Sequence, residues 1–259
     1  MPNADSHILT HQENGVFTIK FNRPDKKNAL TLAMYDKLVE SLEQAESDAS
    51  IRVIVLTGTG DVFTAGNDLY DFMNNPPSDM DSPVIRFLRT LIDVKKPIIG
   101  SVNGMAIGVG TTMLLHCDLV YLADHAVLKM PFVDLGLVPE AASSFILPRM
   151  MGIPRASELL LLGDKMSATE ALEYGLCAKL FPLESLEAEV NKRAQTLAQK
   201  PPASVRATKA LLHKGWQDEM KRALYEEGEL VLEMVRAPEA MEAFSAFFEK
   251  RKPDFSSFS

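Results

Sequence analysis

Hydrophobic residues in the first half of the chain occur in short blocks that predict buried strands separated by helices. The segment VFTIKFN at 16–22 alternates apolar and polar positions, as a half-buried strand does. Three nearly continuous apolar runs, IRVIVLTG, KPIIGSVNG and DLVYLAD, indicate strands buried on both faces. After the first strand, Leu38, Leu42 and their apolar neighbours recur at helical spacing, and Thr31 is placed to cap a helix ending near Ser47. Strands alternating with helices predict an α/β fold with parallel crossovers.

The second half of the chain has a different pattern, which from about residue 154 predicts helix after helix. The break LAQKPPASV precedes the helix at 202. We therefore divide the chain into a core at 1–200 and a C-terminal helical region at 201–259. A polar, proline-rich loop at 73–83 is predicted to flank a site. The expected helices are 155–162, 168–173, 184–199, 202–213, 217–235 and 238–249.

The residue totals argue against several classes of protein. A formal net charge of −8 disfavours sequence-independent binding of nucleic acid. The two cysteines make no disulfide framework, and neither they nor the five histidines have the spacing of metal ligands, so we predict no metal site. The first ten residues lack the pattern of a signal peptide, and no run of about 18 apolar residues occurs. We therefore expect a cytoplasmic protein without a membrane span.

Two glycine-bearing turns are candidates for ligand binding. The turns are GDVFTAGNDL at 60–69 and VNGMAIGVG at 102–110, and each follows a predicted buried strand. The C-terminal ends of such strands are where α/β proteins bind ligands. Small residues let a ligand approach the backbone, and the second turn leads into a helix whose first N–H groups are free. Converging N–H groups would form an oxyanion hole; otherwise, both segments are simply close-packed turns.

Four motifs along the chain resemble the successive signatures of the crotonase superfamily, also called the enoyl-CoA hydratase/isomerase family. They are FNRPDKKNALT, GDVFTAGNDL, KPIIGSVNGMAIGVGTTMLLHCDLVYLAD and FVDLGLVPEAASSFILPRMMG, and the resemblance extends to AFFEKRKPDF. It implies an α/β spiral of ββα repeats followed by a C-terminal helical region that mediates trimerisation, the homotrimers pairing into hexamers as dimers of trimers. It also implies an acyl-CoA thioester as the ligand, with no separate cofactor and no nucleic-acid or membrane partner.

The resemblance also assigns catalytic positions. It places the oxyanion hole at the backbone N–H groups of Ala65 and Val109. Hydratases of this family use two glutamates, and the matching positions here hold Thr112 and Phe132. Neither side chain has a useful pKa near neutrality, so simple hydration is not expected. Glu140 stands where hydratases commonly carry glycine, in a context that is similar to the Δ3,Δ2-enoyl-CoA isomerases with their single glutamate.

These features lead to the hypothesis that Glu140 carries a proton from C2 to C4 of a 3-enoyl-CoA. The plainer interpretation of Glu140 is a helix-start carboxylate held by backbone N–H groups. Asp134 is an alternative base, and Asp68 is expected mainly to cap a helix. Three other functions stay open at this point: hydration, another acyl-CoA reaction such as hydrolysis or ring opening, and binding of CoA without catalysis.

Contacts with the CoA substrate are predicted in several segments. A basic pair near the C-terminus is expected to reach the nucleotide, unless it is simply a solvated tail. Met73, Phe87 and Leu91 are candidates for the acyl channel, although apolar residues at helical spacing more often belong to the core. The predicted binding residues are Lys27, Ala65, Gly66, Asn67, Asp68, Leu69, Gly108, Phe132, Lys250 and Arg251.

Overall fold

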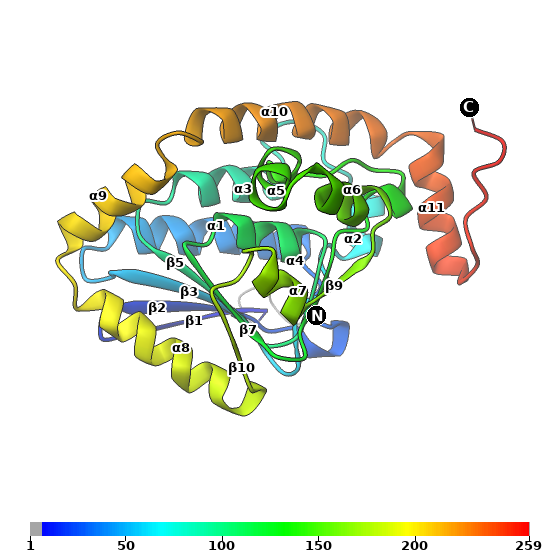
Figure 1. The fold of residues 1–259 in the computed structure, drawn as a ribbon. Coiled ribbons are helices and arrows are strands. Elements are labelled where there is room, and N and C mark those ends of the chain that lie inside the picture. The colour runs from blue at the N-terminus through cyan, green and yellow to red at the C-terminus, as the bar shows by residue number, and fades with distance from the viewer. Residues whose placement is uncertain (1–6, 259) are drawn as a thin grey trace.

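The structure, a computed structural model, describes residues 7–258, which form two β-sheets surrounded by helices (Figure 1). Residues 1–6, which hold most of the segment assessed for a signal peptide, lie outside the described part, as does residue 259. The outer ends of the two predicted regions, 1–200 and 201–259, therefore lie outside it as well. Within residues 7–258, no helix is both long and apolar enough to cross a membrane.

The two sheets contain the strands of a regularly alternating chain. The six-stranded sheet has the order β1-β2-β3-β5-β7-β10, and the four-stranded sheet has the order β4-β6-β8-β9. All neighbouring strands are parallel except β1 with β2 and β8 with β9. The strands of the larger sheet are β1 (Ile8–Glu13), β2 (Val16–Phe21), β3 (Val53–Gly58), β5 (Ile98–Val102), β7 (Leu119–Ala123) and β10 (Lys179–Phe181). Those of the smaller sheet are β4 (Val62–Thr64), β6 (Met105–Ile107), β8 (Val127–Lys129) and β9 (Lys165–Ser167).

Successive strands alternate between the sheets, so that β3, β5 and β7 enter the larger sheet while β4, β6 and β8 enter the smaller one. Each turn of the chain adds one strand to each sheet, which is the predicted spiral of ββα repeats. Strand β5 is buried at every position, as its continuous apolar run predicts. From Phe17 to Phe21, strand β2 alternates buried and half-buried residues, as its period of two predicts.

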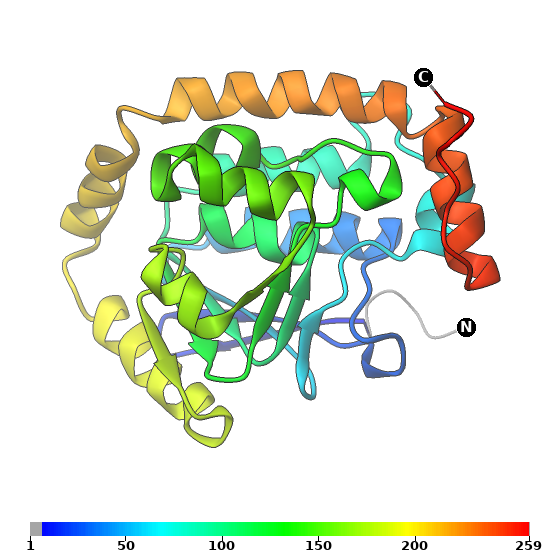
Figure 2. The same ribbon diagram turned by 45° about the vertical axis from the view of Figure 1, so that its right-hand side comes forward.

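Helices cover both sides of the larger sheet. Helix α8 packs on one face, α1 packs on the other, and α3 packs on α1 (Figures 1 and 2). Helix α10 lies across α3 and α5. The helices are α1 (Leu32–Ser47), α2 (Leu69–Asn74), α3 (Pro83–Asp93), α4 (Val109–Thr112), α5 (Ser143–Met151), α6 (Ile153–Leu161), α7 (Ala168–Glu173), α8 (Leu183–Ala198), α9 (Pro202–His213), α10 (Gln217–Met234) and α11 (Pro238–Glu249). Short 3₁₀ helices within residues 7–258 are η2 (Pro24–Lys26), η3 (Met113–His116) and η4 (Val133–Leu135).

Most predicted elements are confirmed, often to within a residue or two. Helix α1 follows Thr31, whose side chain accepts a hydrogen bond from the Met34 N–H at 3.3 Å, as the capping pattern predicts. The expectation of helices alone after residue 154 is wrong, because β9 and β10 pair with β8 and β7. Each of these strands has three residues, which is too short for a hydrophobic period to appear.

Candidate active site

A cavity of about 940 Å³ lies where the glycine-bearing turns meet α2, α3, α10 and α11. The proline-rich loop predicted to flank a site joins α2 to α3, and both helices contribute to the wall. The structure brings all the predicted catalytic and CoA-binding residues except Lys250 to this cavity. Those that line it are Lys27, Ala65, Gly66, Asn67, Asp68, Leu69, Gly108, Val109, Phe132, Glu140 and Arg251.

The two glycine-bearing turns touch each other beside the cavity. Strand β4 pairs with β6, which brings the turns that follow them together. Gly66 has a φ of +84°, and a Cβ atom there would lie 2.6 Å from the Ile107 carbonyl oxygen. A Cβ atom on Gly110 would lie 2.6 Å from the Thr64 Cγ2. These glycines therefore allow the turns to approach one another, in addition to leaving backbone open to a ligand.

The backbone hydrogen bonds decide which N–H groups of the first turn are free. Ala65 donates its N–H to the Lys27 carbonyl oxygen at 2.9 Å, so the prediction that Ala65 supplies an oxyanion-hole donor is wrong. Gly66 donates to the Thr64 hydroxyl at 3.1 Å. The next residue, Asn67, forms a parallel bridge with Leu30. In this bridge Leu30 makes both hydrogen bonds, and the Asn67 N–H points away from the segment that contains Leu30.

Asn67 and Val109 supply the N–H groups that remain available. The two bonds of the bridge run from the Leu30 N–H to the Gly66 oxygen and from the Asp68 N–H to the Leu30 oxygen, both at 2.8 Å. No hydrogen bond among residues 7–258 uses the Asn67 N–H. Val109 is the first residue of α4, so its N–H has no acceptor within the helix, and none is found elsewhere in the described chain. Both residues line the cavity.

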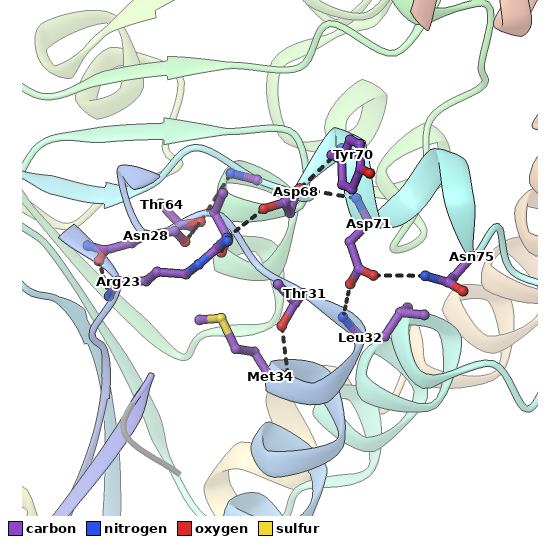
Figure 3. Close-up of polar contacts among 12 residues, drawn as sticks. Arg23, Asn28, Thr31, Leu32, Met34, Thr64, Asp68, Tyr70, Asp71 and Asn75 are labelled. Carbon is purple, nitrogen blue, oxygen red and sulfur yellow. Dashed lines mark hydrogen bonds and ion pairs between the residues drawn. The ribbon is translucent and has the colours of Figure 1, made fainter. Parts of the chain in front are cut away.

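Asp68 has a structural role beside this turn (Figure 3). Its carboxylate pairs with Arg23 at 2.6 Å and accepts hydrogen bonds from the Tyr70 and Asp71 N–H groups at 3.1 Å each. Burial favours a higher pKa for Asp68, but these partners outweigh it and lower the pKa. The expectation that Asp68 caps a helix is confirmed, and its low pKa makes it a weak base. Arg23, which sequence reasoning missed, also lines the cavity.

The surroundings of Glu140 favour the protonated form of its carboxyl group. The Thr112 hydroxyl donates a hydrogen bond to its Oε1 atom. Its Oε2 atom is shielded from solvent and has no hydrogen-bond partner among the described residues. Burial raises the pKa of Glu140 to about 8, the Thr112 hydrogen bond opposes this rise, and the nearby Glu227 carboxylate adds to it. Asp134, the alternative base, instead pairs with Lys129 at 3.1 Å and is exposed.

The helix-start interpretation of Glu140 is wrong, because another glutamate has that role. Helix α5 begins at Ser143, and the carboxylate of Glu227 accepts hydrogen bonds from the Ala142 and Ser144 N–H groups at 2.6 and 3.0 Å. Glu227 belongs to α10 and is 5% exposed. It follows Leu224 by three positions on the buried side of that helix, which is the sequence signal that could have identified it.

The charged residues predicted to bind the nucleotide differ in their surroundings. Lys27 is exposed on the cavity wall. Arg251 also lines the cavity, where Glu249 and Glu242 bind its guanidinium group at 2.6 and 2.5 Å. Lys250 ends α11 in a left-handed conformation and does not line the cavity, so its predicted contact is not supported. Of the basic pair Lys250 and Arg251, only Arg251 lies at the cavity.

Residues of α3 and α10 form an apolar part of the cavity wall. The residues from α3 are Val84, Ile85 and Leu88, and those from α10 are Leu224, Gly228 and Val231. The three channel candidates from the sequence are wrong, because Met73, Phe87 and Leu91 pack in the core and do not line the cavity. Helical spacing identified the buried side of α3, but it could not separate residues facing the core from those facing a cavity.

Comparison with known proteins agrees with this geometry. The family model described as enoyl-CoA hydratase/isomerase matches residues 11–257. "Enoyl-CoA delta isomerase 2" of Rattus norvegicus is 38% identical over 95% of this chain, which spans 64% of the rat protein's length. "1,2-Epoxyphenylacetyl-CoA isomerase" of Escherichia coli K12 is 36% identical over 96% of this chain and 98% of its own length.

A solved structure extends the likeness to the fold. The structure of Pseudomonas aeruginosa OdaA superimposes with a TM-score of 0.91 and 45% identity, covering 93% of this chain and 98% of that one. The family match covers nearly the whole chain and includes the two turns and Glu140. The chain therefore belongs to the enoyl-CoA hydratase/isomerase family, the crotonase superfamily.

Proposed function

We propose that the protein is an enoyl-CoA isomerase that moves a double bond from C3 to C2 of an acyl-CoA thioester. The observation that carries this proposal is the state of Glu140: one carboxylate oxygen is held by Thr112, while the other has no partner among the described residues of a largely apolar cavity. Such surroundings raise the affinity of a carboxylate for a proton. They favour a group that takes a proton from carbon and then returns it.

The reaction needs one base and one site for negative charge. Glu140 removes a proton from C2 of the 3-enoyl thioester, and the C2 electrons form a dienolate whose charge lies on the thioester oxygen. The Asn67 and Val109 N–H groups donate hydrogen bonds to that oxygen. Glu140 then returns the proton to C4, which leaves the double bond between C2 and C3. The proton is recovered within each turnover, so no separate cofactor is required.

Isomerisation is favoured over hydration by the residues that take the place of the two hydratase glutamates. Thr112 uses its hydroxyl to hold Glu140. Phe132 is buried and lines the cavity. Neither can activate a water molecule as a carboxylate does, and an apolar wall keeps water from the dienolate. The CoA moiety of the substrate would lie toward Lys27 and Arg251, and its acyl chain toward α3 and α10.

The test is the turnover of 3-hexenoyl-CoA to 2-hexenoyl-CoA, followed by absorbance of the conjugated thioester. We expect Glu140→Gln to lower kcat by about 10²–10⁴-fold, because the amide keeps the shape of the carboxylate but cannot accept the proton. Hydration of crotonyl-CoA is measured in parallel and is expected to be much slower than isomerisation in the wild-type protein.

Glu158→Gln is the matched control, because Glu158 is an exposed glutamate on α6 and its replacement changes the net charge equally. This control is expected to have wild-type activity. Isomerisation that survives in Glu140→Gln contradicts the role of Glu140. Wild-type hydration as fast as isomerisation would identify the protein as a hydratase. Absence of both reactions in a protein that still binds CoA thioesters would overturn the isomerase assignment.

A further inference from the structure

The backbone that carries Glu140 has an unusual conformation. The two residues after Glu140, Ala141 and Ala142, have φ values of +60° and +56°. A residue with a Cβ atom disfavours this left-handed region, and two in succession persist only where surrounding contacts impose them. The Glu140 carbonyl oxygen accepts a hydrogen bond from the Ser143 N–H at 3.1 Å, which closes the turn. The position of the Glu140 side chain therefore depends on what holds this turn.

Two buried side chains from other elements hold the turn. His116 of η3 lies with its Nε2 atom 2.8 Å from the Ala141 carbonyl oxygen. Burial lowers the pKa of His116 to about 4, so at neutral pH the ring is uncharged and its Nε2–H donates this bond. Glu227 of α10 accepts bonds from the Ala142 and Ser144 N–H groups and from the Ser144 hydroxyl. Its carboxylate thus compensates for Ala142, whose side chain cannot cap α5.

We propose that Glu227 is a positioning residue for proton transfer: from α10, it fixes the turn that holds Glu140 against the cavity, and its negative charge strengthens Glu140 as a base. This inference rests on the proposed isomerase function. Helix α10 also supplies Leu224, Gly228 and Val231 to the cavity wall. One helix therefore contacts both the proposed acyl site and the support of the base.

The charges around Glu140 agree with this role. Glu227 raises the pKa of Glu140 by like-charge repulsion, in addition to the larger effect of burial. Tyr35 of α1 also interacts with Glu140, and burial raises its own pKa, so the phenol is neutral. His116 is neutral as well, and Thr112 carries no charge. Burial raises the pKa of Glu227 itself to about 7, so its carboxylate is charged over the higher pH range in which Glu140 titrates. Removal of the Glu227 charge is therefore expected to lower the pKa of Glu140.

The decisive measurement is an NMR titration of Glu140 in the full-length protein labelled with ¹³C at the glutamate side-chain carboxyl carbon. The Glu140 resonance is assigned as the one missing from Glu140→Gln. In Glu227→Gln, we expect its titration midpoint to move to lower pH than in the wild type. We also expect kcat for 3-hexenoyl-CoA to fall on the order of 10-fold or more, because small displacements of a reacting group are costly.

Glu233→Gln is the matched control, because Glu233 is exposed on the same helix and the replacement makes the same change in charge. Its Glu140 midpoint is expected to equal that of the wild type. An unchanged midpoint in folded Glu227→Gln overturns the inference, whatever happens to kcat. The titration needs no turnover, so a wild-type protein without isomerase activity would overturn the proposed function while the role of Glu227 is still measured.

A second variant covers the case in which Glu227→Gln does not fold. Ser144→Ala removes the hydroxyl that donates to Glu227 and leaves both backbone donors in place. Without this hydrogen bond the charged form of Glu227 is less stable and the pKa of Glu227 rises. The titration midpoint of Glu140 is therefore expected to move to lower pH, by a smaller amount than in Glu227→Gln. A Glu140 midpoint that stays at the wild-type value in Ser144→Ala, with Glu227→Gln unfolded, would also overturn the inference.

Discussion

The proton affinity of Glu140 results from opposing contributions: burial and the Glu227 charge raise its pKa, and the Thr112 hydroxyl lowers it. Burial raises its pKa to about 8, while the Thr112 hydroxyl stabilises the charged form and opposes the rise. A base acts only when it is deprotonated. The kcat/KM of the wild-type protein is therefore expected to increase with pH and to reach half of its plateau near pH 8, as the free protein titrates.

Replacement of Thr112 by valine tests this balance, because valine keeps the shape of threonine and removes the hydroxyl. Without that donor, the charged form of Glu140 is less stable and its pKa rises. The half-maximal pH of kcat/KM is therefore expected to move upward, and activity at pH 7 is expected to fall by about 3- to 10-fold. The measurement is the pH dependence of 3-hexenoyl-CoA isomerisation.

Ser143→Ala provides the control for Thr112→Val. The Ser143 hydroxyl is also buried close to Glu140 in sequence, but it has no hydrogen-bond partner among the described residues. Its removal is expected to leave the half-maximal pH where it is in the wild type. Equal shifts of the half-maximal pH of kcat/KM in Thr112→Val and Ser143→Ala would contradict a specific effect of the Thr112 hydrogen bond.

At the scale of elements, α3 and α10 bound the part of the cavity that we propose for the acyl chain. Gly228 of α10 lines the cavity, and a Cβ atom there would lie 2.9 Å from the Met80 Cε and 3.9 Å from the Ile85 Cδ1. Glycine costs helix stability in the middle of α10, so its presence is consistent with a need for space. The Met80 side chain, from the loop before α3, packs closely against Gly228.

Gly228→Leu is expected to shorten the acyl site. The leucine side chain would occupy the space between α10 and Ile85, so kcat/KM for 3-dodecenoyl-CoA is expected to fall by about 10-fold or more relative to 3-hexenoyl-CoA. Glu229→Leu, which adds the same side chain to an exposed position of α10, is expected to leave this ratio unchanged. A parallel loss for both thioesters would contradict an effect on chain length and indicate general damage to the site.

At the scale of the whole molecule, the buried glutamates make stability depend on pH. Folding raises the pKa of Glu140 from 4.5 to about 8 and that of Glu227 from 4.5 to about 7. Between pH 4.5 and about pH 8, the folded protein holds more protons than the unfolded chain, so the free energy of unfolding decreases as pH rises. The cost of the charged Glu140 is fully present only above about pH 8.

Glu140→Gln removes this cost and is expected to be more stable than the wild type at high pH. The gain in the free energy of unfolding is expected to be near zero at low pH and on the order of 1–3 kcal/mol at high pH. This gain is measured by guanidinium denaturation at roughly pH 5 and roughly pH 9, which lie below and above the folded-state pKa values of Glu140 and Glu227. A gain that does not grow with pH would contradict the raised pKa of Glu140.

Assembly is a second property of the whole molecule. Large apolar side chains are exposed on the C-terminal helices, including Leu211 and Leu212 of α9 at 70% and 75% and Phe247 of α11 at 57%. Exposed apolar surface on this scale is typical of protein interfaces. We propose that these helices form a homotrimer, or a hexamer of paired trimers. Light scattering after size-exclusion chromatography measures the mass, and a monomer at micromolar concentration would contradict this proposal.

Local patterns in the sequence were sufficient to predict most elements and the order of the motifs. Thr31 caps α1 and Asp68 caps α2 because capping depends on residues a few positions apart. The resemblance of the motifs also identified Glu140 and Val109, which now lie in one cavity. Such features are determined by neighbours in the chain or by a short motif, so the sequence contains them directly.

Only the tertiary structure decided which N–H groups at the site are available to a ligand and which residues support the Glu140 turn. Ala65 and Asn67 differ in the availability of their N–H groups because Lys27 and Leu30, distant in sequence, pair with this turn. The support of the Glu140 turn comes from Glu227, whose bonding partner Ala142 is 85 positions away. Hydrogen-bond availability and burial depend on contacts between distant segments, and these contacts exist only once the chain has folded.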